Sequence, residues 1–395
     1  MNSSYERSLS AHQSMRIAEE TIRLLNLRAS DEAHGFDLKT YRCKLVDEHD
    51  QAIYYGFGKG LGIQSKVSAY FEALEHYAVH QFAQDSANNL DNYIFIDNYK
   101  HILPCINLID IHSGEEMSYP VFMLDPRYGK RKSKYDKMDY SNYTYLANDS
   151  GVASGTNMTE ASIHALNELA ERDAHSLFLI EAFIKKKNQR IRLIDKSTLP
   201  LFQKKIVTQI EHQYNDYLML FDITTDIGIP VIYVSMTKQP FLIQPSGCGA
   251  SLKAEYALER ALLESLQPVH IHNENLTANQ NKIIQQLSSF PLLLNAAIAD
   301  VTRLKGIYEA VDFDRISNNN ADLSLIDQLN LITYKIRQAG YKIFKIPVID
   351  HSSGFSCIKY FIPGFEQFHL VQTGKRILPN KRGMRTLNNE SETIC

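Results

Sequence analysis

Three segments of the sequence share one pattern, in which acidic residues stand directly beside an apolar stripe at helical spacing. In the first segment, residues 65–83, the apolar stripe consists of Val67, Phe71, Leu74 and Ala78. Steps of three and four residues are typical of a helix that packs one face against a core. Ser68, Glu72 and Glu75 each follow a member of the stripe by one residue. They therefore lie about 100° around the helix, at the edge of its buried face.

The second and third segments repeat this arrangement. Residues 159–187 predict a long helix whose edge stripe consists of Glu160, His164, Glu168, Glu171 and His175. Residues 252–267 predict a third helix, with Arg260, Glu264 and Gln267 along its edge. Carboxylates three residues apart lie only about 5–6 Å from each other, and such pairs are usually solvated. Gathered in one place, they would form a negative pocket that needs a cation, and Mg²⁺ favours such hard oxygen ligands.

A glycine cluster, GFGKGLG at residues 56–62, lies between a predicted strand and the first of these helices. Backbone N–H groups at a helix N-terminus favour anions, and Lys59 would add a positive charge, so a phosphate site is one interpretation. A flexible turn is the other. The cluster has neither P-loop nor dinucleotide-binding spacing. The zincin and nucleophile-elbow motifs are also absent. His164 and His175 are weaker candidates for metal ligands.

Composition narrows the class of protein. The 395 residues are 44% hydrophobic and 22% charged, which is enough to bury a large core and excludes a mainly disordered chain. Lys and Arg number 42 against 45 Asp and Glu, so the balance gives no case for nucleic-acid binding. No apolar run is long enough for a membrane span. There is no secretory signal, and the five scattered Cys predict free thiols. These features predict a cytoplasmic protein.

The remaining segments predict a mixture of strands and helices without a flexible linker. Residues 39–57 predict a hairpin, 92–125 predict short strands, and the basic segment 127–137 predicts a solvated loop. Residues 221–236 and 348–364 both predict a strand, a tight turn and a strand. They are either an internal repeat or two independent hairpins. We therefore expect one large domain with an N-terminal extension.

Three blocks of sequence resemble the signature blocks of the YcaO family. They are GKG(x)₇SAYFEALEHY, SGVASG(x)₄EA(x)₆ELAERDA and GCGAS(x)₆LERALLESLQ, in the family's order and over roughly residues 50–370. The resemblance implies an α+β fold with mixed or antiparallel sheets and ATP-site helices lined with Glu. It implies an extension over 1–50, a catalytic domain over 51–373 and a basic, polar tail over 374–395.

The resemblance also implies an activity. YcaO proteins use ATP and Mg²⁺ to phosphorylate the oxygen of a peptide backbone amide after a nucleophile has added to the carbonyl. We expect cyclodehydration of Cys, Ser or Thr to thiazoline or oxazoline in a ribosomally synthesised precursor peptide, as in bacteriocin and antibiotic biosynthesis. Formation of a thioamide or amidine, and a non-catalytic ATP-binding scaffold, are the alternatives.

Residue roles carry over position by position. The metal ligands expected from the resemblance are Glu72, Glu75, Glu168 and Glu171. The residues expected to bind the nucleotide are Lys59, Ser68, Glu72, Glu160, Arg172, Arg260, Glu264 and Gln267. The residues expected to take part in catalysis are Glu72, Glu171, Arg172 and Arg260. The helix-edge pattern selects the same residues from the three helices, with the exception of Arg172.

Three features depart from the family pattern. His76 stands where an Arg is common, and Thr156–Asn157 reverses the usual order of Asn and Thr. The chain ends in NESETIC, without the proline-rich tail of many azoline-forming members, which leaves a base role for the carboxylate of Cys395 unsupported. About 55 residues precede the first block, so we expect a separate E1-like or peptide-recognition partner. A flavin dehydrogenase partner and a homodimer are further expectations.

Overall fold

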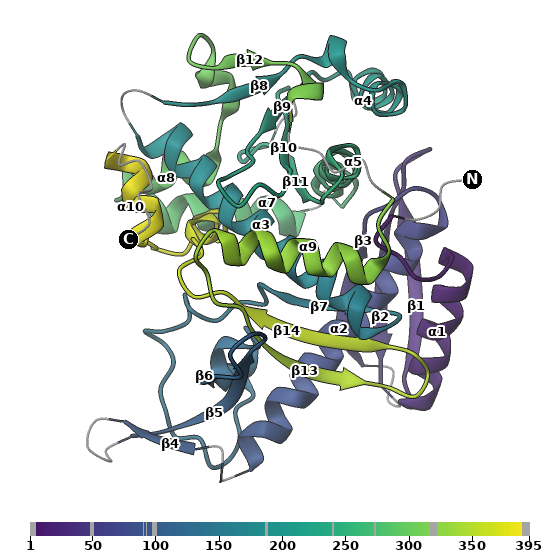
Figure 1. Ribbon diagram of the computed structural model, residues 1–395, viewed down its shortest axis with the longest axis vertical. Helices are drawn as coiled ribbons and strands as arrows, with labels where there is room; N and C mark the ends of the chain where they lie inside the picture. The colour runs from purple at the N-terminus through teal and green to yellow at the C-terminus, as the bar shows by residue number, and fades with distance from the viewer. Residues whose placement is uncertain are drawn as a thin grey trace.

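The computed structural model describes residues 5–47, 51–89, 91, 93–96, 101–185, 189–238, 241–271, 274–316 and 322–388. Within them the chain forms three sheets with helices packed on and between them, so the predicted α+β class is confirmed. In Figure 1 one sheet lies in the upper half of the molecule and another in the lower half, with α3 and α9 crossing between them. The third sheet stands beside α1 near the N-terminus.

The N-terminal sheet is an antiparallel meander, and its last two strands confirm the predicted hairpin. The side chain of Ser10 caps α1 by accepting a hydrogen bond from the backbone N–H of Gln13. The helix therefore begins at the next residue, Ala11. The apolar stripe predicted for α2 is buried against this sheet and against α1. These elements are α1 (Ala11–Leu24), β1 (Arg28–His34), β2 (Thr40–Val46), β3 (Ala52–Gly58) and α2 (Ile63–Asn88).

The upper sheet has the strand order β11-β10-β9-β8-β12, and only its β12–β8 pair is parallel among the described strands. Helices α4 and α5 pack on one face of it and α3 on the other. The strands are β8 (Arg192–Ile194), β9 (Leu218–Asp222), β10 (Val231–Met236), β11 (Ser246–Ala250) and β12 (Glu309–Val311). The helices are α3 (Met158–Leu179), α4 (Leu201–Tyr214) and α5 (Ala254–Ser265).

The lower sheet has the order β4-β5-β13-β14-β7, with β6 paired to β5. The two similar segments of the sequence both form strand, turn and strand, but one lies in the upper sheet and the other here. The strands are β4 (Tyr93–Ile96), β5 (His101–Asp110), β6 (Glu116–Pro120), β7 (Val152–Gly155), β13 (Phe344–Asp350) and β14 (Ser356–Phe361). The remaining helices include α6 (Gln267–His270), α7 (Glu274–Leu287), α8 (Pro291–Ile298), α9 (Leu325–Gln338), the 3₁₀ helix η8 (Phe368–Thr373) and α10 (Lys381–Asn388).

Glycines in β3, β7 and β11 allow a helix to approach each strand at backbone contact. A Cβ added to Gly58 would lie 1.7 Å from the carbonyl oxygen of Ser65 in α2, and one added to Gly249 would lie 2.2 Å from that of Ala257 in α5. Gly155 faces α3 in the same way, with its Cβ position 2.8 Å from the N of Ala161. The interpretation of the whole glycine cluster as a flexible turn is therefore wrong, because its first glycines belong to a packed strand.

The basic segment 127–137 is not simply a solvated loop, which corrects the prediction for it. The Tyr128 side chain is fully buried, and its hydroxyl donates a hydrogen bond of 2.8 Å to Asp136. Tyr140 donates to the same carboxylate at 2.8 Å. The Lys and Arg side chains between them remain mostly exposed. The aromatic residues therefore anchor the segment while its charges stay in water.

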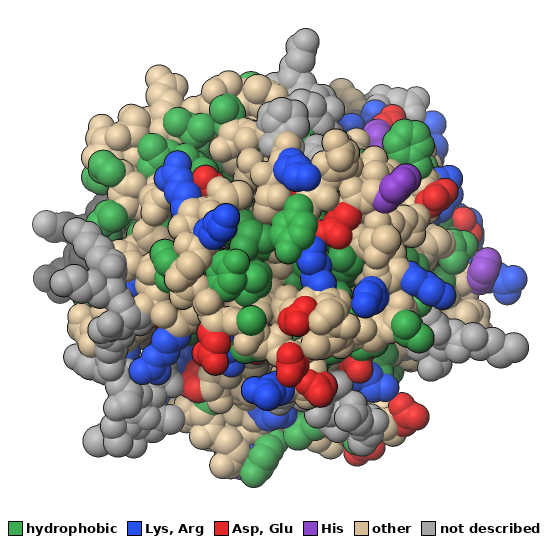
Figure 2. Space-filling model, turned by 90° about the horizontal axis from the view of Figure 1, so that it is seen from above, with side chains coloured by type: hydrophobic (Ala, Val, Ile, Leu, Met, Phe, Trp, Pro, Cys, Tyr) green, Lys and Arg blue, Asp and Glu red, His purple; other side chains and the backbone are tan. Residues whose placement is uncertain are grey.

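The surface and the cysteines agree with the composition. Figure 2 shows acidic and basic side chains interspersed on the face that it presents. Cys43, Cys105, Cys248 and Cys357 are buried free thiols, whereas Cys395 lies outside the described residues. In the described ranges, no helix is both long enough and apolar enough to cross a bilayer.

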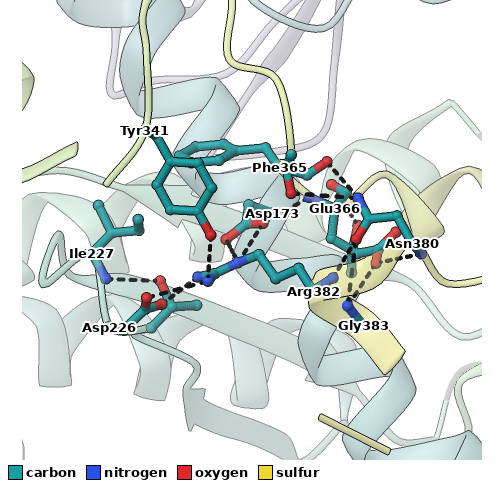
Figure 3. Close-up of polar contacts among 12 residues, drawn as sticks. Asp173, Asp226, Ile227, Tyr341, Phe365, Glu366, Asn380, Arg382 and Gly383 are labelled. Carbon is teal, nitrogen blue, oxygen red and sulfur yellow. Dashed lines mark hydrogen bonds and ion pairs between the residues drawn. The ribbon is translucent and has the colours of Figure 1, made fainter. Parts of the chain in front are cut away.

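The C-terminal helix α10 is docked by a buried ion cluster, which Figure 3 shows. The Arg382 side chain is 3% exposed, and its Nε donates to Asp173 of α3 at 3.0 Å. Its guanidinium also pairs with Asp226. Glu366 accepts a hydrogen bond of 2.9 Å from the backbone N–H of Asn380, just before the helix. The positive charge of Arg382 is therefore compensated inside the chain.

Candidate functional site

A cavity of about 1350 Å³ lies where α2, α3 and α5 face one another. Its walls are completed by the N-terminal segment (residues 5–10), by the loop after β3 and by η8. The structure brings all the site residues predicted from the sequence to this one cavity. They are Lys59, Ser68, Glu72, Glu75, Glu160, Glu168, Glu171, Arg172, Arg260, Glu264 and Gln267.

The two acids of α2 are half-buried and held by hydrogen bonds at one wall. Glu72 accepts a bond of 3.1 Å from the backbone N–H of Phe57, and Glu75 accepts one of 3.0 Å from the hydroxyl of Ser154. Burial raises the pKa of both carboxyls. The pKa of Glu75 is raised well above its usual value, because Glu168 adds like-charge repulsion. A bound cation would offset the free-energy cost of keeping each of these carboxylates charged.

The acids of α3 face those of α2. Glu168 accepts a hydrogen bond of 2.8 Å from the Gly151 N–H and pairs with Arg172 at 2.7 Å. Burial raises the pKa of the Glu171 carboxyl to about 7, and repulsion from Glu264 contributes while Lys59 opposes it. At neutral pH this carboxyl is therefore poised between its charged and neutral forms.

Arg172 is fixed by the loop 146–151, in which no site residue was selected from the sequence. Its guanidinium donates hydrogen bonds to Asp149 at 3.0 Å and to the Ser150 hydroxyl at 2.6 Å. Although burial acts in the opposite direction, Arg172 holds the pKa of the Asp149 carboxyl well below its usual range. Asp149 lies in a loop with no periodic pattern, so the sequence alone carried no signal for it.

The wall of the cavity formed by α5, α6 and the loop after β3 carries cations as well as an acid. Lys59 forms an ion pair with Glu264 across the cavity. The side chain of Arg260 lines the cavity, and its buried Nε has no hydrogen-bond partner among the described residues. Gln267 donates a bond of 3.4 Å to the carbonyl of Phe57. Ser68 lines the opposite wall. This side of the cavity therefore combines positive charge with polar groups.

Glu160 is already saturated by the N-terminal segment. Its carboxylate accepts hydrogen bonds from Arg7 at 2.9 Å, from the Ser8 N–H at 3.1 Å and from Thr156 at 2.7 Å. The side chain is 1% exposed. Although burial opposes it, Arg7 lowers the pKa of this carboxyl. Glu160 therefore joins the N-terminus to α3, a contact between residues far apart in the sequence that no local pattern predicts.

The acid set fits a divalent cation by its charge rather than by a preformed cage. Within the described ranges, no three Asp, Glu, His or Cys side chains lie close enough together to hold a metal ion as they stand. Burial nevertheless raises the pKa of Glu72, Glu75, Glu168 and Glu171 at the cleft. Such a surplus of partly or fully buried carboxylates is what a hard cation would neutralise.

Comparison with known sequences identifies relatives over most of the chain. A family model described as the ATP- and Mg²⁺-binding YcaO cyclodehydratase matches residues 57–366. An uncharacterized protein of Methanothermobacter thermautotrophicus is 24% identical over 356 residues, which are 83% of this chain and 86% of that protein. An uncharacterized protein in the tfuA 3′ region of Rhizobium leguminosarum bv. trifolii is 32% identical over 130 residues, 32% of this chain and 28% of that one.

Solved structures share the fold. YcaO from Methanopyrus kandleri, bound with AMPPCP and Mg²⁺, has a TM-score of 0.66 at 16% identity, and the match covers 95% of this chain and 96% of the Methanopyrus chain. A heterocyclase in complex with substrate and cofactor also has a TM-score of 0.66, at 17% identity over 91% of this chain, which spans about half (52%) of that heterocyclase. The E. coli microcin synthetase McbBCD complex matches with a TM-score of 0.54 at 12% identity. Since the family model matches well over half of the sequence, the chain belongs to the YcaO family, whose members bind ATP and Mg²⁺.

Proposed function

We propose that this protein uses ATP and Mg²⁺ to activate a backbone amide in a ribosomally synthesised precursor peptide. The product that we propose is a thiazoline or oxazoline, formed by cyclodehydration of Cys, Ser or Thr. The observation that carries the proposal is the convergence of acids and cations from three separate helices on one cavity. Such a convergence suits phosphoryl transfer, in which catalysis consists largely of positioning and charge neutralisation.

The side chains divide into two groups under this proposal. Glu72, Glu75, Glu168 and Glu171 would hold Mg²⁺, which neutralises phosphate charge when bound. Arg172, Arg260 and Lys59 would face the phosphates, together with Ser68, Glu264 and Gln267 at the nucleotide. Glu160, whose carboxylate already accepts hydrogen bonds from Arg7 and Ser8, would support the nucleotide site by holding the N-terminal segment against α3. Arg172 is oriented before any ligand binds, because Asp149, Ser150 and Glu168 fix its guanidinium. This preorganisation favours a role in transition-state stabilisation.

We further propose that a separate protein presents the peptide. The E. coli microcin synthetase, which shares this fold, is a complex of several subunits. We propose three associations: an E1-like partner protein, a flavin dehydrogenase that would oxidise an azoline, and a second copy of this chain. Each partner protein can be added in turn to a reaction with ATP, Mg²⁺ and a candidate precursor peptide.

The test is a reaction of the full chain with ATP, Mg²⁺, a candidate precursor peptide and the partner proteins, followed by mass spectrometry. Loss of one water per site supports the azoline, whereas a gain equal to sulfur replacing oxygen identifies a thioamide. Binding of ATP without modification or turnover in any combination would identify a scaffold instead. The Glu72→Gln variant should abolish ATP turnover, while Glu309→Gln, which changes an exposed acid of β12, should leave it intact. Wild-type turnover in Glu72→Gln would overturn the assignment.

A further inference from the structure

One end of the cavity is lined by residues outside the predicted site. His175 of α3, Tyr233 of β10, Cys248 of β11 and His369 of η8 all contribute to its wall. His175 follows Arg172 by three residues and Glu171 by four, so all three lie on one face of α3. The His175 and His369 rings stack with 6.3 Å between their centroids. This end therefore directly adjoins the charged part of the cavity.

The four side chains at the end of the cavity with the two histidines are themselves neutral at neutral pH. Burial lowers the pKa of His175 to about 4 and that of His369 well below its usual value, with Arg172 contributing to the latter. Burial raises the pKa of Tyr233 to about 12 and that of Cys248 well above its usual value. These four side chains offer no opposite charge to a phosphate, whereas a neutral amide needs only hydrogen bonds, so this neutral end suits an amide.

Hydrogen bonding fixes the tautomer of His369. Ser176 Oγ lies 2.6 Å from the carbonyl oxygen of Arg172 and 3.3 Å from that of Glu366. Neither carbonyl oxygen can donate, so the single serine hydrogen goes to a carbonyl. Ser176 Oγ also accepts a bond of 2.9 Å from the His369 backbone N–H and lies 3.0 Å from His369 Nδ1. Because a carbonyl oxygen takes the serine hydrogen, we assign the hydrogen of that third contact to Nδ1. Nε2 of His369 is therefore unprotonated and offers a lone pair.

Among the described residues, none donates a hydrogen bond to that lone pair. His369 Nε2 is buried and makes no hydrogen bond to any of the described residues, although its ring lines the cavity. Leaving a buried acceptor unpaired costs free energy, which a ligand with an N–H or O–H group would recover. The arrangement matches that of a general base, in which one ring nitrogen is anchored and the other is left to take a proton.

We propose that the neutral end of the cavity holds the peptide amide and its attacking side chain, and that His369 Nε2 is the general base. The proposal rests on the cyclodehydration proposed above. In this step the proton of the thiol or hydroxyl moves to Nε2 while its sulfur or oxygen forms a bond to the carbonyl carbon. The C=O π bond breaks, and its electron pair goes to the carbonyl oxygen, which then becomes the group that ATP phosphorylates.

The surroundings of His369 explain why such a base would act only in the loaded enzyme. Arg172, Lys375 and a protonated His175 all oppose a positive charge on the ring, and Asp149 favours it. Tyr233 and Cys248 are neutral neighbours on the facing strands. A bound nucleotide brings negative charge next to Arg172 and so raises the pKa of His369. The proton acceptor thus gains strength when the phosphates are in place.

The experiment compares His369→Gln with the wild type, using the complete reaction of peptide, partner, ATP and Mg²⁺. We expect ATP affinity and melting temperature to stay near wild type, and peptide modification to fall by about 100-fold or more, the usual contribution of a general base. The rate of the wild type should fall at acidic pH both as Glu171 and as Nε2 become protonated. Only the part of the fall that is due to Nε2 should be missing in the variant. His112→Gln, which changes an exposed histidine, is the matched control.

A second variant separates a chemical role from a structural one. Added imidazole should restore part of the modification rate of His369→Ala, because a free base can occupy the vacated space. A wild-type rate and pH profile in His369→Gln would overturn the proposal, and so would a loss of rate with unchanged pH profile and no rescue by imidazole. If the wild type itself modifies no peptide but binds ATP, the proposed function fails and not merely the assignment of the base.

Discussion

Replacing Glu171 with Gln should stabilise the protein in the absence of ligand while it abolishes ATP turnover. Glu171 is 8% exposed, and burial raises the pKa of its carboxyl from 4.5 to about 7. The Lys59 charge compensates it only in part, because Lys59 is paired with Glu264. Above pH 7 the folded chain therefore keeps a carboxylate in a place that favours the neutral acid. Gln has the same shape and no charge to bury.

The pKa sets the size and the pH range of the effect. A carboxyl with a raised pKa in the folded state contributes stability below its unfolded value, and this contribution is lost as the pH rises toward the folded value. The shift from 4.5 to about 7 corresponds to about 3 kcal/mol at about 1.4 kcal/mol per pKa unit. For 395 residues the entropy of unfolding is roughly 0.8 kcal/mol/K. The melting temperature should therefore rise by about 3–4 °C in Glu171→Gln.

Thermal unfolding from about pH 5 to pH 9, without nucleotide, measures this effect. The variant should melt above the wild type at the alkaline end and together with it at the acidic end. Glu309→Gln, at an exposed position, should show no pH-dependent difference. An equal or lower melting temperature for Glu171→Gln at the alkaline end would refute the reasoning. Addition of Mg²⁺ and ATP should reverse the order, because only the wild type has the carboxylate for the cation.

Two further predictions concern packing and the C-terminal cluster. Gly249→Ala should lower the free energy of unfolding by about 1–3 kcal/mol or more, because the added Cβ would lie 2.2 Å from a helix carbonyl oxygen. The control is Gly129→Ala, whose Cβ would meet nothing nearer than 3.8 Å, and it should melt like the wild type. Equal melting temperatures for the two would contradict the close approach of α5 to β11. Arg382→Met should lower the free energy of unfolding, measured in urea, by about 3–5 kcal/mol, because Asp173 would stay buried without its cation. The double variant with Asp173→Asn should recover much of that loss, and no recovery would show that packing of Arg382 matters more than its charge.

The parts of the molecule that local periodicity determines were predictable from the sequence. A helix needs one buried face, so Val67, Phe71 and Leu74 fixed how α2 would turn, and Glu72 and Glu75 followed at its edge. The hairpin of β2 and β3 was equally local, because alternating side chains and a polar turn are enough to specify it. No global information was needed for either.

Contacts between distant segments were not predictable. Arg7 and Ser8 reach Glu160 across more than 150 residues, and His369 meets Ser176 across 193. Neither pair follows a periodic pattern, because each is set by the way that the chain returns to α3. Asp149 was missed for the same reason. The docked Arg382 was also hidden, since a basic residue in a polar stretch is usually solvated.

Three strand glycines lie directly opposite three acids of the facing helices, although the glycines and the acids look unrelated in the sequence. A Cβ on Gly56 would lie 3.1 Å from the Cβ of Glu72, one on Gly155 would lie 3.1 Å from that of Glu160, and one on Gly247 would lie 2.8 Å from that of Glu264. Each strand glycine thus makes room for the first carbon of an edge residue on the facing helix. Because the helix can then rest on the strand backbone, its edge residues are held at the cavity wall. A larger residue on the strand would move the acid itself, so we infer that this glycine spacing is part of the site.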